Sequence, residues 1–347
     1  MSWQGAAIRW SLRRTFRPAT ERTIDVARIR ARASKRLWTP RVPAGWRLAE
    51  RYGDDAGPLR GEWLTRGRAP DAAGDAAART ILYLHGGGYY FCSPHTHRAI
   101  TFGLAQRADA DVFSVDYRLA PEHPFPAALD DALAAWRALL ATGIAADRVV
   151  IAGDSAGGGL ALAALVALRD AGGPLPAGAV LFSPWTDLAS TGASMRDNDG
   201  RDPMFRGAVF ARVAPMYLGD TPATHPLASP LYAPLHGLPP LFLRAGSTEV
   251  LLDDTRRVAA RARDAGVAVD CAVWPDMPHI WPIYAPFMPE ARRVLDEAAG
   301  FVRRVTARGG AGDGGASGTG GAADARHAPD LLRSPDTPGQ SSETSIA

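Results

Sequence analysis

A serine flanked by glycines is the first feature of this sequence that could do chemistry. The pentapeptide GDSAG spans residues 153–157, with Ser155 at its centre. An apolar run (149–152) precedes it, and an Ala/Leu-rich stretch (156–170) follows. A GxSxG sequence between a buried strand and a helix is typical of the nucleophile elbow, a sharp turn that exposes the serine hydroxyl. This context favours Ser155 as a nucleophile over the alternative, an ordinary strand-to-helix turn.

A run of glycines upstream offers a place for negative charge. His85 and three glycines come directly after the apolar run 81–84. Such a turn lets backbone amides approach a reacting carbonyl closely, so we expect the amides of Gly86, Gly87 and Ala156 to bind its oxyanion. The alternative is a phosphate loop, but neither GK[ST] nor GxGxxG accompanies these glycines.

Short apolar runs alternate with helical stretches around these motifs. The expected strands are 81–84, 112–115, 149–152, 179–182, 241–244 and 269–274. The expected helices between or after them are 127–142, 156–170, 253–265 and 289–307. Strands that are apolar throughout and separated by helices indicate a parallel sheet covered on both faces. We therefore expect a doubly wound α/β core.

Three segments fall outside this alternation. Residues 1–47 hold twelve basic and two acidic residues, with apolar residues at helical spacing. We expect amphipathic helices that pack as part of a lid, or alternatively a helix at a membrane surface. Residues 188–237 lack a clean strand and predict an insertion above the carboxyl edge of the sheet. The Gly-, Pro- and Ser-rich tail, 308–347, is expected to be disordered.

Composition limits the classes of protein. The 347 residues include 46% apolar residues, which excludes disorder for most of the chain, and no window approaches a membrane-spanning length of about 18 to 20 apolar residues. The basic N-terminus lacks aromatic interleaving, so we expect no nucleic-acid partner. Arginines interrupt any secretory h-region, which makes a cytoplasmic location the expectation. Cys92 and Cys271 lack metal-ligand spacing and read as reduced packing thiols.

Together, these motifs resemble the hormone-sensitive-lipase-like family of α/β-hydrolase esterases. The resemblance covers about residues 80–305 and rests on HGGGYY (85–90), DYRLAPEHPFPAALDDA (116–132), GDSAGGGLA (153–161), SPWTDL (183–188), EVLLDD (249–254) and MPHIW (277–281). It implies the α/β-hydrolase fold, a mostly parallel doubly wound sheet with a helical cap. The core would then be 48–307, and 1–47 and 188–237 would form the cap. The family often forms dimers, so a homodimer is one expectation.

The base and the acid follow from chain order, because a nucleophile elbow is completed in the order Ser, Asp/Glu, His. Of eight histidines, only His279 follows directly after the last predicted strand, so it is the predicted general base. The resemblance puts Glu249 in the acid role, although the family more often has Asp-Pro where this chain has Glu249-Val250. Asp253 and Asp254, in the first turn of the next expected helix, are the alternatives.

These residues predict two-step hydrolysis of short- to medium-chain acyl esters or small lactones by a Ser-His-Glu triad. Four side chains, Tyr89, Tyr90, Met204 and Phe205, are expected to line an apolar substrate pocket. The mechanism needs neither a metal nor an organic cofactor. A non-catalytic small-molecule receptor on the same scaffold and an amide or carbamate hydrolase are the alternatives. The physiological substrate does not follow from the sequence.

Overall fold

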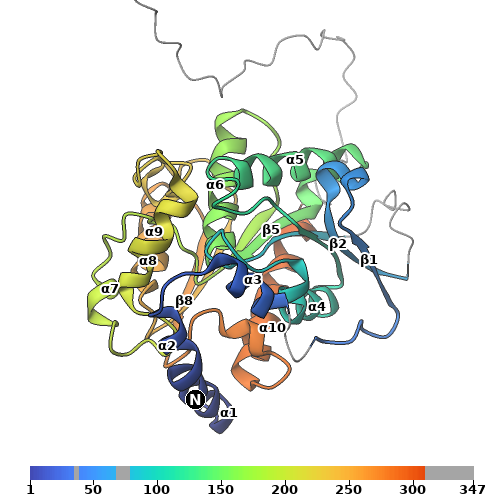
Figure 1. Ribbon diagram of the computed structural model, residues 1–347. Helices are drawn as coiled ribbons and strands as arrows, with labels where there is room; N and C mark the ends of the chain where they lie inside the picture. Colours follow the sequence, from blue (N-terminus) through green and yellow to red (C-terminus); the bar gives the residue numbers. More distant parts are fainter. Residues whose placement is uncertain (35–38, 68–78, 309–347) are drawn as a thin grey trace, which may run out of the picture. The chain divides into compact units, whose positions relative to one another are not determined.

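One sheet organises the described part of the chain, with the strand order β1-β2-β4-β3-β5-β6-β7-β8 (Figure 1). The strands are β1 Trp46–Arg51, β2 Gly61–Arg66, β3 Arg79–Leu84, β4 Ala110–Val115, β5 Val149–Asp154, β6 Gly178–Phe182, β7 Leu241–Gly246 and β8 Val269–Trp274. From β4 through β3 to β8 all neighbours are parallel, whereas β2 pairs antiparallel with both β1 and β4. The computed structural model describes residues 1–34, 39–67 and 79–308.

Helices fill the connections between the strands. The α-helices are α1 Trp3–Ser11, α2 Arg17–Thr20, α3 Val26–Ser34, α4 Arg98–Ala108, α5 Ala127–Ala141, α6 Ala156–Asp170, α7 Ser194–Asp197, α8 Gly207–Leu218, α9 Leu252–Asp264 and α10 Pro289–Arg308. A π-helical segment, η1 Leu12–Phe16, joins α1 to α2. The 3₁₀ turns are η2 Asp54–Leu59, η3 Pro94–His97, η4 Ala146–Arg148, η5 Pro230–Tyr232 and η6 Trp281–Tyr284.

The sheet is covered on both faces, as predicted. Alternate side chains of β3 divide between two cores: Ile81 and Tyr83 pack with α4 and α10, while Leu82 and Leu84 pack with α5, α6 and α9. This period of two places every second strand residue on the same face. Figure 1 shows α4 and α10 on one side of the sheet and α5 and α6 on the other. The predicted doubly wound α/β fold is confirmed.

The six strands predicted from apolar runs correspond to β3 through β8. The pattern missed β1 and β2, which form an antiparallel hairpin at the sheet edge. β1 reads WRLAER, and its charged residues mask the strand signal. β2 buries Glu62 and Thr65, polar residues that a search for apolar runs passes over. Helix α4 was also missed between two predicted strands.

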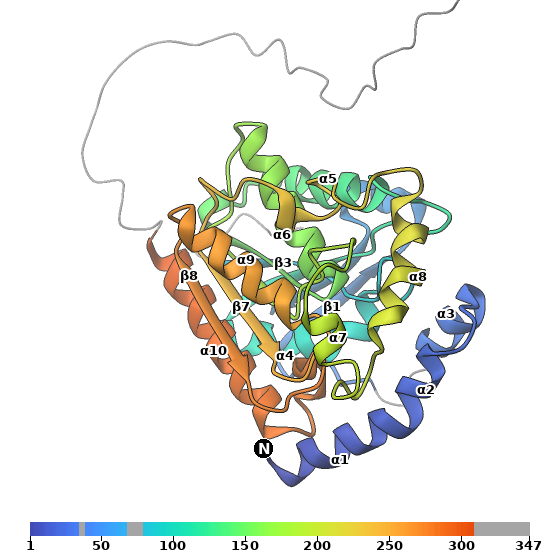
Figure 2. The same cartoon turned by 90° about the vertical axis from the view of Figure 1, so that its left-hand side faces the viewer.

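The N-terminal helices contact the insertion between β6 and β7. We call residues 1–34 and 188–237 together the cap. Arg13 and Arg17 donate to the carbonyl of Gly200 over 3.3 and 3.4 Å. The ring of Phe16 packs edge-on against Phe205, with centroids 5.7 Å apart. Figure 2 shows α2 and α3 on the side of the molecule where α8 lies.

These contacts join the two segments that the sequence predicted as one cap. Residues 35–38, which belong to the basic N-terminal segment expected to form amphipathic helices, lie outside the described residues. So does the predicted disordered tail, 308–347, apart from Arg308 at the end of α10.

Candidate active site

Ser155 lies in the turn between β5 and α6. Its backbone has φ +52° and ψ −122°, a conformation that is uncommon for a residue with a side chain. The flanking glycines permit the turn: a Cβ on Gly153 would come within 2.3 Å of the Gly157 carbonyl oxygen, and one on Gly157 within 2.0 Å of the Leu84 oxygen. The predicted GxSxG geometry is therefore present, and Ser155 lines a cavity above the sheet edge.

His279 and Glu249 meet beside this cavity. Glu249 follows β7, His279 follows β8, and His279 Nδ1 lies 2.7 Å from Glu249 Oε2. Both side chains are buried, and His279 lines the same cavity as Ser155. Burial alone lowers the pKa of His279, but its hydrogen bond to Glu249 and the charges of Glu249 and Asp202 outweigh burial and hold that pKa above its ordinary value.

Glu249 is fixed by more than the imidazole. Its Oε1 accepts the Ser183 hydroxyl over 2.8 Å and also accepts the Gly246 amide. The Ser183 oxygen in turn accepts the Ile280 amide over 3.3 Å, directly after His279. Ser183, in the SPWTDL segment after β6, thus connects the acid to the loop that carries the base. Ser183 belongs to the SPWTDL motif, but the sequence alone did not predict a role for it.

The alternative acids face elsewhere. Asp254 is buried, and its Oδ2 accepts the backbone amides of Thr186 and Asp187 over 2.7 and 2.9 Å. Asp253 accepts the Ser194 amide over 2.9 Å. Both lie in the first turn of α9, where the helix dipole favours negative charge, as predicted. Of the three candidates, Glu249 is the one that the structure brings to His279.

The first glycine of the HGGG turn points away from the cavity. Its amide donates to Asp154 Oδ1 over 3.1 Å, so the assignment of the Gly86 amide to the oxyanion is wrong. Gly87 and Gly88 line the cavity instead, and their amides make no hydrogen bond within the described residues. Ala156 is the first residue of α6, where the amide has no partner inside the helix.

His85 orients this turn. Its Nδ1 lies 2.7 Å from the Gly86 carbonyl oxygen, so that nitrogen must carry the proton and donate it. Burial lowers the pKa of His85 to about 3, which keeps the ring neutral. In a trans peptide the carbonyl and the following amide point in opposite directions, so this bond directs the Gly87 amide away from His85.

Asp154, next to the nucleophile, anchors three groups behind the site. Besides Gly86, its carboxylate accepts the Tyr83 hydroxyl over 2.6 Å and lies 3.1 Å from His97 Nε2. Burial opposes its charge, but His97 and the Tyr83 hydrogen bond outweigh burial and hold the pKa of Asp154 below its ordinary range. The buried carboxylate is thus satisfied by hydrogen bonds and does not face the reacting atoms.

The cavity at Ser155, here called the Ser155 pocket, holds about 150 Å³. Three of the four side chains predicted for it do line it, namely Tyr90, Met204 and Phe205, together with Trp185 and Phe210. An apolar lining with a few polar groups is typical of small-molecule sites.

Tyr89 is not in this lining, so the prediction for it is wrong. Its φ of +65° turns the ring into the core, where it stacks on Tyr217 with centroids 3.7 Å apart. The side chain is 1% exposed. Neighbouring positions in the motif thus have opposite fates, with Tyr90 in the pocket and Tyr89 in the core.

A second cavity lies under the N-terminal helices and adjoins the first. This N-terminal cavity holds about 420 Å³ and is lined by η1, α2 and α3. Phe16, Tyr90 and Phe205 line both cavities. The cap therefore lines both the Ser155 pocket and the neighbouring N-terminal cavity.

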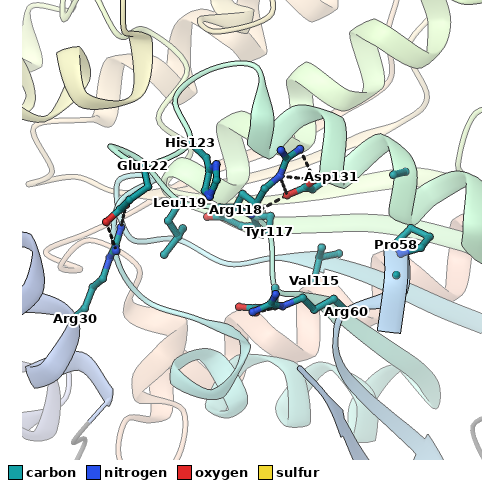
Figure 3. A pocket seen from close by; sticks show the side chains of 13 residues that line it. Arg30, Pro58, Arg60, Val115, Tyr117, Arg118, Leu119, Glu122, His123 and Asp131 are labelled. Atoms are coloured by element: carbon teal, nitrogen blue, oxygen red, sulfur yellow. Dashed lines mark hydrogen bonds and ion pairs between the residues drawn. The ribbon is translucent and has the colours of Figure 1, made fainter. Parts of the chain in front are cut away.

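Arg30 of α3 ties the cap to two core loops. Its Nε donates to the Tyr90 carbonyl over 2.8 Å and its Nη2 to the Ala120 carbonyl over 2.8 Å. The same guanidinium pairs with both oxygens of Glu122, at 2.9 and 2.7 Å. Figure 3 shows this pair at one side of a surface cavity of about 530 Å³, where Arg118 likewise faces a carboxylate, that of Asp131. The arginines drawn there are thus engaged with acids of the chain itself.

One group of side chains has the composition of a metal site. Potential ligand atoms of Glu50, Glu62 and His95 lie within 4.8 Å of one another. The guanidinium of Arg98 already donates to both carboxylates, with Nε 2.9 Å from Glu62 Oε2. Tyr52 donates to Glu62 over 2.6 Å. Arg98 supplies the positive charge that this acidic pair requires, and we assign no metal to it.

Within the described ranges, no helix has both the length and the apolar character that crossing a bilayer would require.

Comparison with known proteins places the chain in a family of known fold. Residues 81–283 match a protein family described by its α/β hydrolase fold. An acetyl-hydrolase of Streptomyces hygroscopicus is 50% identical over 231 residues, which is 67% of this chain and 77% of that protein. An esterase of Acinetobacter venetianus is 37% identical over 227 residues, 65% of this chain and 75% of that one.

Solved structures of esterases have the same fold as this chain. A crystal structure of an esterase from the bacterial hormone-sensitive lipase family has a TM-score of 0.79 and 39% identity, covering 88% of this chain and 99% of that one. EstE5, in a crystal soaked with p-nitrophenyl butyrate, has a TM-score of 0.78 and 37% identity, covering 88% and 100%. With this fold, these motifs and these relatives, the chain belongs to the α/β-hydrolase family and resembles its hormone-sensitive-lipase-like esterases.

Proposed function

We propose that this protein is a serine carboxylesterase, with Ser155 as nucleophile, His279 as general base and Glu249 as the acid that orients the base. The observation that carries the proposal is the 2.7 Å contact between His279 Nδ1 and Glu249, made beside a pocket that Ser155 and His279 both line. The acetyl-hydrolase and esterase names of the relatives support the same class of reaction.

The first half of the reaction forms an acyl-enzyme. His279 removes the proton of the Ser155 hydroxyl while its oxygen attacks the ester carbonyl carbon. The amides of Gly87 and Gly88, which line the pocket, and that of Ala156, next to Ser155 at the start of α6, stabilise the resulting oxyanion, because none of the three has a backbone partner among the described residues. His279 then gives its proton to the departing alcohol. Glu249 keeps the imidazole in the tautomer that carries a proton on Nδ1.

The second half repeats these steps with water. His279 takes a proton from the water molecule while the water oxygen attacks the acyl carbonyl carbon. The bond between the acyl carbon and the Ser155 oxygen then breaks, and His279 returns the proton to that oxygen. Free carboxylic acid and the resting enzyme result. The residues at hand account for every proton moved, so no cofactor is required.

The volumes of the two cavities support short- to medium-chain esters as substrates. The Ser155 pocket, about 150 Å³ and mainly apolar, suits a short acyl chain or a small alcohol. The adjoining N-terminal cavity, about 420 Å³, gives room for a medium chain. We propose the cap as the element that selects among esters, since η1, α2 and α3 contribute the walls of this space.

A purely receptor function on the same scaffold is the main alternative from another class. It does not require the acid and base to be in contact, whereas the buried Glu249–His279 pair is the arrangement that activates a serine. Amide or carbamate cleavage uses the same residues, and a panel of matched ester and amide substrates separates these reactions.

The test is the hydrolysis of p-nitrophenyl butyrate by the Ser155→Ala variant. We expect loss of nearly all activity and of labelling by a fluorophosphonate, with an unchanged melting temperature. Ser190→Ala is the matched control, because the Ser190 hydroxyl is buried without a hydrogen bond in the described structure and faces no reacting group. Labelling that persists in Ser155→Ala would place the nucleophile elsewhere.

Three finer predictions stay predictions. Lactone hydrolysis, a homodimer and a cytoplasmic location rest on the motifs and the resemblance described above. A lactone panel, sedimentation equilibrium and cell fractionation test them in turn.

A further inference from the structure

The outward face of α1 exposes two large aromatic side chains. Trp3 is 77% exposed and Trp10 is 62% exposed. They lie seven residues apart, about two helical turns, so they project from the same face. The exposed Ala7 lies between them, and the Arg14 guanidinium lies 4.7 Å from the Trp10 ring centroid. Large apolar residues gathered on one exposed face mark an interaction surface.

The opposite face of this segment already has its partners. Leu12 is buried, Phe16 lines both cavities and Gly5 lies against Met288. The Ser2 hydroxyl, at the start of α1, donates to Glu290 over 2.8 Å. The inner face of this segment therefore holds it on the protein. Polar residues at the positions of Trp3 and Trp10 would not weaken that packing, so packing does not explain the two exposed tryptophans.

Positive charge predominates in the N-terminal segment that carries this face. The exposed arginines of the N-terminal segment outnumber its exposed acids, Glu21 and Asp25. These arginines are Arg13, Arg14, Arg22, Arg28 and Arg32. Tryptophan is enriched at the boundary between lipid headgroups and acyl chains, and arginine is attracted to anionic headgroups. An amphipathic helix with both features is typical of segments that lie in the plane of a membrane surface.

We propose that the outer face of α1 docks on the surface of an anionic phospholipid bilayer. Trp3 and Trp10 enter the headgroup region, and Arg14 binds lipid phosphate beside them. Charge complementarity selects this occupant over a second copy of the chain, because two such basic faces repel each other. The same segment walls the N-terminal cavity, so docking would bring the route to Ser155 close to the lipid surface. This inference goes beyond the proposed esterase function and does not depend on it.

Co-sedimentation of the full chain with vesicles tests the proposal. We expect binding to vesicles of phosphatidylcholine mixed with phosphatidylglycerol, and much weaker binding to phosphatidylcholine alone. Trp3→Ser combined with Trp10→Ser should abolish sedimentation. Arg14→Ala should weaken the affinity about fivefold, the effect of one arginine near an anionic surface. Arg263→Ala removes an exposed arginine from α9, which lies away from α1 in both views, and should leave binding unchanged (Figures 1 and 2).

Several outcomes overturn the proposal. They are absence of binding to both kinds of vesicle, binding that survives the tryptophan double substitution, and equal weakening by Arg263→Ala. Sedimentation equilibrium adds another: a dimer that the double substitution dissociates would assign this face to a second copy of the chain.

Activity on dissolved p-nitrophenyl butyrate, measured without vesicles, separates this proposal from the esterase proposal. The tryptophan double variant should keep the rate of the unaltered protein, which also shows that it folds. Vesicle binding by a protein without esterase activity would remove the proposed function and leave the docking surface standing.

Discussion

The amide of Gly86 donates to the carboxylate of Asp154 over 3.1 Å, so the first glycine of the HGGG turn is held by the residue that precedes the nucleophile. This bond removes one amide from the set available to a substrate. It also links the HGGG turn to the nucleophile elbow, because Asp154 and Ser155 are consecutive. Gly87 and Gly88, whose amides have no partner among the described residues, line the pocket instead.

Gly88→Ala tests the revised oxyanion site. A Cβ there would come within 3.0 Å of Tyr90 Cε1 and 3.3 Å of Val213 Cγ1, and the turn would have to shift. We expect kcat/KM for p-nitrophenyl butyrate to fall about 10²-fold, as for loss of one oxyanion donor. Gly172→Ala is the control, because Gly172 has a similar φ, +65° against +58°, with nothing within 4 Å of its Cβ. Equal losses of activity at both positions would attribute the effect to backbone strain.

The pH profile should follow the Glu249–His279 pair. Because the pKa of His279 is raised, activity should fall with decreasing pH from a point above the ordinary histidine value of 6.5, as the imidazole becomes charged and can no longer accept the serine proton. Glu249→Gln removes the negative charge, so this midpoint should move to lower pH while the plateau rate falls by about 10²- to 10⁴-fold. Rates of p-nitrophenyl butyrate hydrolysis across pH measure both.

Asp253→Asn is the matched control for that variant, since Asp253 follows the same strand but binds the Ser194 amide. It should leave both the midpoint and the plateau nearly unchanged. If the midpoint of the pH profile did not move in Glu249→Gln, Glu249 would not be the group that raises the pKa of His279.

Phe16→Ala should change acyl-chain selectivity. Phe16 lines both the Ser155 pocket and the N-terminal cavity, and it packs on Phe205. Its removal takes away part of the wall that the two cavities share, so kcat/KM for p-nitrophenyl decanoate should rise relative to that for butyrate. Leu12→Ala deletes a buried side chain of the same segment that lines neither cavity and should cost about 2 to 5 kcal/mol of stability without altering this ratio. Unchanged selectivity in Phe16→Ala would argue against the cap as the selecting element.

Arg30→Ala should release the cap from the core. The variant loses the bonds to the carbonyls of Tyr90 and Ala120 and the pair with Glu122. We expect KM to rise by about tenfold, because side-chain bonds to carbonyls contribute about 1.5 kcal/mol when the donor is charged, with a smaller change in kcat. Arg28→Ala, an exposed arginine of the same helix, should have little effect. Steady-state kinetics that show equal changes in both variants would contradict the role of Arg30.

The central strands and the three triad candidates could be predicted from sequence for a shared reason. Buried parallel strands leave long apolar runs, and each of Ser155, Glu249 and His279 follows directly after such a run. Loops that follow parallel strands meet at one edge of a sheet, so position in the chain predicted that an acid after β7 would meet His279. The resemblance, and not position, selected Glu249 over Asp253 and Asp254.

Finer details depended on backbone orientation, which residue types do not report. Gly86 and Gly88 are identical residues in one turn, yet one amide meets Asp154 and the other glycine lines the pocket. Tyr89 and Tyr90 differ because the positive φ of Tyr89 sends its ring into the core. Arg30 could not be selected among a dozen basic residues of the N-terminal region, since its partners lie 60 and more positions away.

Arg30 has a consequence for the catalytic cycle. Its guanidinium donates to the carbonyl of Tyr90, three residues after Gly87. This bond connects α3 of the cap to the turn that we propose as the oxyanion site. If α3 moved away from the core to release product, this bond would break and the turn would lose its support. Such a movement would shift the Gly87 and Gly88 amides relative to a bound ester, so hydrolysis and product release would take place in different positions of α3.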